Sequence, residues 1–212
     1  MRTLIFSIIF LFSFTSFAQL KEAYFQYNIE IEAVDSSMKT KQTVAMLRNS
    51  KMELYFAPNR TRMDFKMGEL SMTTVIMDRE KDVMLSLSDS YAGKMAMLGK
   101  PESSKKEQDP NVKTTSFNEV KTILGYKCTK FVVVENGSTT EYWITKDILI
   151  DSKDQGILNS NLPGFPVAFS KVEDDVKMTF QLVNMEKQLK SPASNLFSTV
   201  VPEGFTLVKG ME

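Results

Sequence analysis

The feature that most constrains the fold is a strict two-residue alternation of apolar and polar side chains. In the segment AYFQYNIEIEAV, residues 23–34, one side carries Phe25, Tyr27 and Ile29, while the residues between them are polar. The segment RTRMDFKM, residues 60–67, alternates in the same way. This period is typical of a β-strand with one buried face and one wet face. Such strands belong to antiparallel sheets, because parallel strands are usually apolar on both faces.

Turn-forming residues divide the chain into short runs that predict successive hairpins. The predicted strands are 51–57, 60–67, 70–78, 83–88, 121–135, 138–145, 166–173 and 176–188. The predicted turns include Pro58-Asn59, Asn136-Gly137 and Asp174-Asp175. Residues 42–50 fit either a short helix begun near Ser36 or Ser37 or an extension of the next strand, and we favour the helix. A short helical turn is expected in PASNLF, residues 192–197.

The segment 100–113 differs in composition from its neighbours. It holds two prolines, seven charged residues and one aliphatic residue, which predicts an exposed, flexible loop. Both flanking regions are strand-like, so we expect the loop to join two halves of one sheet. The domain prediction is therefore a single β domain over residues 19–212.

Residues 1–18 have the pattern of a secretory signal peptide. Arg2 is followed by the apolar run 4–14, and Ala18 ends a small-residue cleavage pattern. The apolar run is too short to span a bilayer, which takes about 20 residues. Position 19 is glutamine rather than the cysteine of a lipoprotein. These observations predict a soluble protein that is periplasmic or secreted, with no transmembrane segment.

The charge and the missing residue types exclude several classes of function. Removing Arg2 from the 26 basic residues leaves 25 against 26 acidic ones, so nucleic acid is not an expected partner. The chain has no histidine, which removes Ser-His and Cys-His pairs and histidine metal sites. The carboxylates are scattered and isolate no catalytic pair. We therefore expect no enzyme, no cofactor and no metal site. A hydrolase that uses carboxylates alone stays open as an alternative, because such a pair meets only in the folded chain.

The single cysteine allows two interpretations and the methionines allow three. Cys128 lies in a predicted strand, and we expect an inert, buried thiol rather than a reactive thiolate. Ten of the fourteen methionines lie between Met38 and Met97. They fit core filling or an adaptable surface for apolar guests, and Met95 and Met97 share a face as Cu(I) ligands would.

Several stretches resemble a known family. AMLRNSKMELYFAPNRTRMDFKMG, TTVIMDREKDVMLSLSD and GKMAM resemble a family of exported Gram-negative proteins with a domain of unknown function. TILGYKCTKF, EYWITKDI, PGFPV and NLFSTVVPEGF resemble its second half. The resemblance implies structural roles for Cys128, Trp143 and Pro202, and a fold similar to the LolA/LolB-type lipoprotein carriers. That fold is a curved, unclosed antiparallel half-barrel whose apolar concave side is covered by short helices.

These observations lead to one functional hypothesis and one alternative. The hypothesis is a periplasmic, non-catalytic carrier that holds an acyl chain, a lipid or a lipoprotein segment on the concave face of the sheet. The residues expected on that face are Phe25, Ile29, Met63, Phe65 and Met72. The alternative is a structural or interaction module of the cell envelope, with a protein partner and no small ligand.

Overall fold

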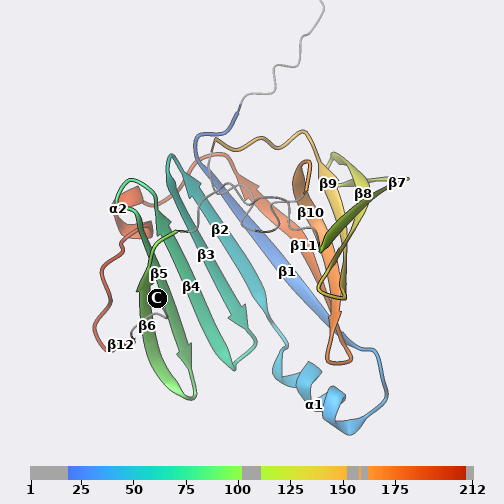
Figure 1. Cartoon of the computed structure of the whole chain (residues 1–212), viewed down its shortest axis with the longest axis horizontal. Coiled ribbons are helices and arrows are strands. Elements are labelled where there is room, and N and C mark those ends of the chain that lie inside the picture. Colours follow the sequence, from blue (N-terminus) through green and yellow to red (C-terminus); the bar gives the residue numbers. More distant parts are fainter. Residues whose placement is uncertain (1–18, 102–110, 152–157, 159–161, 209–212) are drawn as a thin grey trace, which may run out of the picture.

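A computed structural model describes residues 19–101, 111–151, 158 and 162–208. Within these residues the chain forms one mainly antiparallel twelve-stranded sheet, whose strands follow the order β12-β6-β5-β4-β3-β2-β1-β11-β10-β9-β8-β7 (Figure 1). The strands are β1 (Ala23–Ala33), β2 (Lys51–Ala57), β3 (Arg60–Met67), β4 (Ser71–Asp78), β5 (Val83–Ser90), β6 (Gly93–Gly99), β7 (Val112–Ile123), β8 (Tyr126–Glu135), β9 (Ser138–Thr145), β10 (Phe165–Glu173), β11 (Val176–Glu186) and β12 (Thr206–Val208). The helices are α1 (Met38–Met46) and the single turn α2 (Ala193–Leu196). The sheet is not closed, which confirms the predicted fold class of a curved, open sheet.

Two meanders meet at the centre of the sheet. Strands β2 to β6 follow one another on one side, β7 to β11 follow one another on the other side, and β1 pairs with both β2 and β11. The predicted turns at Asn59, at Asn136-Gly137 and at Asp174-Asp175 are confirmed, and all five residues have positive φ. Asparagine, aspartate and glycine adopt this conformation more readily than other residues, which is why they mark tight hairpins.

The predicted helix is confirmed as α1. Ser37 is its N-cap, and its Oγ accepts a hydrogen bond from the Thr40 backbone nitrogen at 3.1 Å. The helix ends at Met46, earlier than residue 50, and Ser50 Oγ then donates to the Leu47 carbonyl at 2.6 Å. The same oxygen accepts from the Gly68 backbone nitrogen at 2.9 Å, which fastens the β3–β4 turn to the end of α1.

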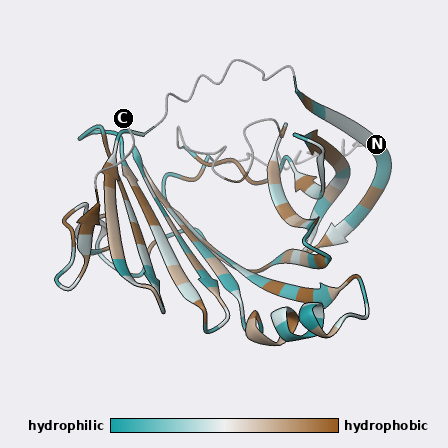
Figure 2. Cartoon of the chain, turned by 60° about the horizontal axis from the view of Figure 1, so that its bottom comes forward, coloured by the Kyte–Doolittle hydropathy of each residue, from teal (hydrophilic) through white to brown (hydrophobic). Residues whose placement is uncertain are grey.

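The main hydrophobic core lies on the face toward which the sheet curls. Phe25 of β1 packs between Phe56 and Phe165, with ring centroids 5.9 and 4.4 Å away. The buried Tyr27 hydroxyl donates to the Pro166 carbonyl at 2.7 Å, which links the centre of the sheet to β10. Figure 2 shows the two halves of the sheet curling toward each other, with hydrophobic and hydrophilic residues alternating along the strands.

A second core lies on the outer face of the sheet, over β2 to β6. It is formed where the C-terminal segment 189–205 crosses this face and buries Phe197 against Ile76, Leu85 and Ala96. Arg62 Nη1 donates to the Leu196 carbonyl at 3.1 Å, which holds α2 in place. The segment then ends in β12, which pairs in parallel with β6 at the edge of the sheet.

Three expectations about local structure need correction. First, α2 packs on the outer face, not on the concave side that the family resemblance implied, because Leu196 joins the second core. Second, segment 121–135 is not one strand, since Leu124 and Gly125 have positive φ and form the β7–β8 turn. Third, the predicted loop 100–113 is too long at its end, because β7 already begins at Val112. Residues 102–110 of that loop and the predicted signal peptide, residues 1–18, lie outside the described residues.

Within the described part of the chain, neither α1 nor any other helix is long and apolar enough to cross a membrane.

Candidate ligand-binding groove

A groove of about 510 Å³ opens on the concave face of the sheet. Small-molecule sites commonly measure about 300–1,000 Å³, so the groove is large enough for a ligand. Its walls come from strands that are far apart in the sheet order but brought together by the curvature, and from Leu158, which precedes β10. The lining residues are Met52, Met63, Phe65, Met67, Thr140, Tyr142, Leu158, Phe169, Lys171, Glu173, Met178 and Phe180.

A continuous run of aromatic rings lines one wall of this concave groove. Tyr142 stacks on Phe169 at 5.5 Å between ring centroids, and Phe169 stacks on Phe180 at 4.3 Å. Phe180 in turn lies 6.2 Å from Phe65, with the two rings nearly parallel at 25°. These four rings belong to β9, β10, β11 and β3, so the run crosses the middle of the sheet. It gives the groove a broad, rigid apolar surface.

Methionine side chains line the groove beside this aromatic run and continue beyond it. Met63 on β3 stands opposite Val75 on β4, Val75 opposite Ser86 on β5, and Ser86 opposite Met97 on β6. Directly paired residues point to the same face, so Met97 lies on the same concave face as Met63. The parallel row from Phe65 ends at Met95.

The position of these methionines bears on the three interpretations of the methionine-rich segment. Met52 is buried in the core, whereas Met95 and Met97 are 41% and 37% exposed. Core filling therefore accounts for some methionines, and an apolar surface accounts for others. That Met95 and Met97 share a face agrees with the sequence pattern, and Cu(I) binding there stays a prediction.

Polar groups lie at the end of the groove formed by β10. Lys171 Nζ and Glu173 Oε2 form an ion pair at 2.6 Å, and both side chains are partly exposed. Thr140 lies on the neighbouring strand β9 and also lines the groove. The groove thus has apolar walls and a polar end, an arrangement that suits an amphipathic guest.

The five residues predicted for the concave face fall into three groups. Met63 and Phe65 line the groove. Phe25 and Ile29 lie on the same face but are buried in the core, where they support the groove without lining it. The face predicted for Met72 is wrong, because Met72 is paired with Lys66 and alternates with Thr73, which shares the face of Phe65. Met72 therefore lies on the outer face of the sheet.

Several groove residues were missed because they come from the second half of the chain. Met178 and Phe180 lie in the predicted strand 176–188, but pattern alone does not reveal that this strand pairs with β1. Phe169 and Tyr142 follow from the same pairing, since Phe169 stands opposite both Phe180 and Tyr142. The missing information was the strand order, not the faces of the strands.

Cys128 is buried, as predicted. Burial raises the pKa of its thiol, and the Sγ atom donates to the Tyr126 carbonyl at 3.4 Å. A raised pKa lowers the thiolate fraction at neutral pH, so this arrangement does not activate the sulfur. Trp143 lies on the outer face, where its Nε1 donates to Glu141 at 3.2 Å and Lys121 Nζ lies 3.9 Å from its ring centroid. In the described residues no three His, Cys, Asp or Glu side chains gather as a metal site would require.

Fold and groove together define a class of protein: an open, strongly curved antiparallel sheet with an apolar groove on its concave face. Residues 36–205 match the family described as "Domain of unknown function (DUF4412)", and the chain belongs to this family. Membership of a family with a domain of unknown function is thereby confirmed. The search of curated proteins finds no relative of this chain.

Solved structures show a distant likeness. PNGF-II in one crystal form has 14% sequence identity and a TM-score of 0.51, and the match covers 90% of this chain and 32% of that one. A second crystal form of PNGF-II gives a TM-score of 0.48 at 14% identity. The lipoprotein LppX of Mycobacterium tuberculosis has a TM-score of 0.38 at 8% sequence identity, and the match covers 81% of this chain and 89% of that one. The chain spans about a third of PNGF-II, and the likeness at 0.51 concerns the fold alone.

Proposed function

We propose that this protein is a non-catalytic carrier that holds the acyl chain of a lipid or lipoprotein in the concave groove. The observation that carries the proposal is the apolar lining of the groove, in which methionines and a run of four aromatic rings surround about 510 Å³ of space. Flexible methionine side chains adapt to apolar guests of different shape, and the stacked rings provide a fixed wall.

The energetics are compatible with reversible binding. Burial of one methylene contributes about 0.8 kcal/mol, so a twelve-carbon chain gains on the order of 10 kcal/mol. Association opposes this gain, because the loss of translational and rotational freedom costs roughly 4–15 kcal/mol. The two quantities are similar, which suits a protein that takes up a chain and releases it again.

The proposed absence of catalysis rests on the side chains of this sequence. There is no histidine, and the only cysteine is buried with a raised pKa. Binding through apolar burial needs neither residue type. Export through the signal peptide 1–18 would place the carrier in the periplasm or outside the cell, where acyl chains cross an aqueous space.

The test measures uptake of a fluorescent fatty-acyl probe by delipidated protein, with two matched methionine variants. Met63 lines the groove on β3, and Met72 lies on the outer face of the neighbouring strand β4. We expect Met63→Gln to weaken probe binding by about tenfold, since a methionine side chain contributes about 1.5–3 kcal/mol on full burial. Met72→Gln should leave the affinity unchanged.

Two results would contradict the carrier proposal. One is the failure of delipidated protein to take up any acyl probe, and the other is an equal effect of both substitutions. Native mass spectrometry of protein purified from its own cell envelope adds an independent check, because a carrier should retain lipid. A stable protein partner without lipid would favour the alternative of an envelope interaction module.

A further inference from the structure

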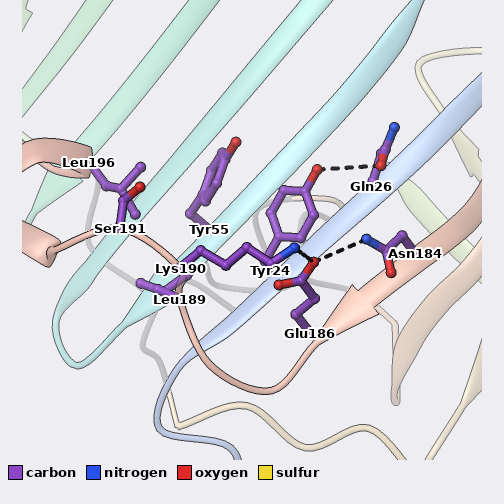
Figure 3. A pocket seen from close by; sticks show the side chains of 9 residues that line it. All are labelled: Tyr24, Gln26, Tyr55, Asn184, Glu186, Leu189, Lys190, Ser191 and Leu196. Atoms are coloured by element: carbon purple, nitrogen blue, oxygen red, sulfur yellow. Dashed lines mark hydrogen bonds and ion pairs between the residues drawn. The ribbon is translucent and has the colours of Figure 1, made fainter.

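A second hollow, of about 350 Å³, lies on the outer face of the sheet, on the side opposite to the concave groove. We call it the outer pocket. Its floor is formed by β1, β2 and β11, and its wall is formed by the C-terminal segment that follows β11 (Figure 3). The lining residues are Tyr24, Gln26, Tyr55, Asn184, Glu186, Leu189, Lys190, Ser191 and Leu196.

Strand register explains why these side chains meet. Tyr24 of β1 stands opposite Tyr55 of β2 and also opposite Glu186 of β11. Two residues further along β1, Gln26 stands opposite Asn184. Directly paired residues point to one face, so the two tyrosines, the two amides and the carboxylate form one surface.

The two tyrosine rings, which we call the aromatic platform, lie next to each other on this floor, and Arg62 lies over the Tyr55 ring, 5.9 Å from its centroid. Their centroids lie 5.0 Å apart, with the ring planes tilted by 43°. Glu53, which borders the pocket, holds both phenols: its Oε1 lies 3.0 Å from the Tyr24 hydroxyl and its Oε2 lies 3.5 Å from the Tyr55 hydroxyl. The platform is therefore fixed before any ligand arrives, which lowers the entropy lost on binding.

The charges of the outer pocket are balanced internally. Glu186 Oε1 accepts from Lys190 Nζ at 2.6 Å and from the Asn184 side-chain amide at 3.3 Å. Glu53 Oε1 is paired with Lys51 Nζ at 3.2 Å. With each carboxylate matched by a lysine, the pocket offers no excess charge to attract an ionic ligand.

A ligand that fits this chemistry is neutral, has an apolar flat face and carries hydroxyl groups around its rim. A sugar ring has these properties, because its C–H groups can lie on an aromatic face while its hydroxyls donate and accept hydrogen bonds. Gln26, Asn184 and Ser191 provide both donors and acceptors, and Glu186 provides an acceptor. We propose that the outer pocket binds a neutral saccharide, stacked on Tyr24 and hydrogen-bonded by Gln26, Asn184 and Glu186.

The test titrates isotope-labelled full-length protein with three neutral disaccharides, namely cellobiose, maltose and N,N′-diacetylchitobiose, and follows the backbone amide signals by NMR. We expect at least one of them to shift the signals of Tyr24, Tyr55 and Asn184, with a dissociation constant in the millimolar range. Tyr24→Ala, which removes half of the platform, should weaken binding by about tenfold. Gln26→Leu keeps the size of the side chain, removes its hydrogen bonds and should weaken binding as well.

Controls separate this site from general surface effects and from the concave groove. Tyr91 is 93% exposed in the β5–β6 turn, so Tyr91→Ala should leave saccharide binding unchanged. Tyr24→Ala should leave acyl-probe uptake unchanged, because the two sites lie on opposite faces. The proposal is overturned if none of the three disaccharides shifts these signals, or if Tyr24→Ala and Gln26→Leu, both shown by thermal unfolding to be folded, bind as well as the unmodified protein. Either result would leave the carrier function untouched.

Discussion

Burial and the carboxylate of Glu53 together raise the pKa of two tyrosines on the outer face. Burial is the largest cause that raises the pKa of Tyr55, from 10.0 to about 12, and the negative charges of Glu53 and Asp64 add to it. For Tyr24, burial and the hydrogen bond to Glu53 raise the pKa well above the usual range. Both phenols therefore stay neutral in the folded protein far into the alkaline range, where they keep their hydrogen bonds.

The raised pKa of Tyr55 predicts how the stability of the protein changes at high pH. A group that prefers its protonated form in the folded state stabilises that state below its unfolded pKa and loses the contribution as pH rises to the folded pKa. For Tyr55 this window runs from 10.0 to about 12. We expect the melting temperature of the unmodified protein to fall more steeply across this window than that of Tyr55→Phe, as measured by thermal unfolding at a series of pH values.

The comparison with Tyr55→Phe removes the contribution of lysines, which titrate in the same range in both proteins. A difference titration of tyrosinate absorbance between the two proteins should give an apparent pKa of about 12 for Tyr55. Parallel melting curves and a difference titration near 10.0, the ordinary value, would show that the Tyr55 phenol is not held in its neutral form.

At the scale of elements, the turn between β3 and β4 depends on glycine at one position. Gly68 has φ +53°, and a Cβ atom there would overlap the Met46 carbonyl oxygen at the end of α1. Gly137 has φ +80° in the β8–β9 turn, but a Cβ atom there would meet nothing within 4 Å. The two glycines therefore share a left-handed backbone and differ in the space around them.

Gly68 and Gly137 therefore allow a matched comparison of how much an alanine destabilises each turn. We expect Gly137→Ala to lower the free energy of unfolding by about 1 kcal/mol, from the left-handed backbone alone. Gly68→Ala should lower it by about 2–4 kcal/mol, because the overlap with Met46 adds an overpacking term. Denaturant unfolding of both variants gives the comparison. Equal losses would mean that the β3–β4 turn and α1 move apart without cost.

The elements also show how much of the fold follows from sequence. Alternation identified β1 and β3 and the face of Phe65, because one face of each strand is mostly polar. It failed for Met72, since β4 carries apolar side chains on both faces: Val75 points toward the concave side, while Ile76 is buried on the outer side under the C-terminal segment. A strand with apolar side chains on both faces lacks the polar–apolar contrast that marks the buried face.

The order of the strands in the sheet was the second feature that the sequence pattern did not predict. Turn residues determine which neighbours in sequence pair with each other, but β1 also pairs with β11, more than 140 residues later. Because the aromatic run of the groove depends on this pairing, half of the groove was not predictable from local patterns. The missed turn at Leu124-Gly125 has a similar cause, since leucine rarely adopts the positive φ of 50° that it has here.

For the whole molecule, the two hydrophobic cores lie on opposite faces of one sheet. The concave core joins the centre of the sheet to β10, and the outer core binds the C-terminal segment across β2 to β6. This segment starts after the central strand β11 and ends in β12 at the edge, and six of the twelve strands lie between these two in the sheet order. The half of the sheet that carries Met63 and Phe65 on its concave face is therefore packed on its outer face by the C-terminal segment.

Phe197 is the side chain on which this packing depends most, because it is 2% exposed and contacts three strands through Ile76, Leu85 and Ala96. We expect Phe197→Ala to lower the free energy of unfolding by about 3–5 kcal/mol, the usual loss for a buried phenylalanine. Phe117 on the edge strand β7 is 39% exposed, so Phe117→Ala should change stability by less than about 1 kcal/mol. Denaturant unfolding of both variants tests the prediction. If Phe197→Ala costs no more than Phe117→Ala, the C-terminal segment does not support the sheet, and the curvature that forms the groove must come from the concave core alone.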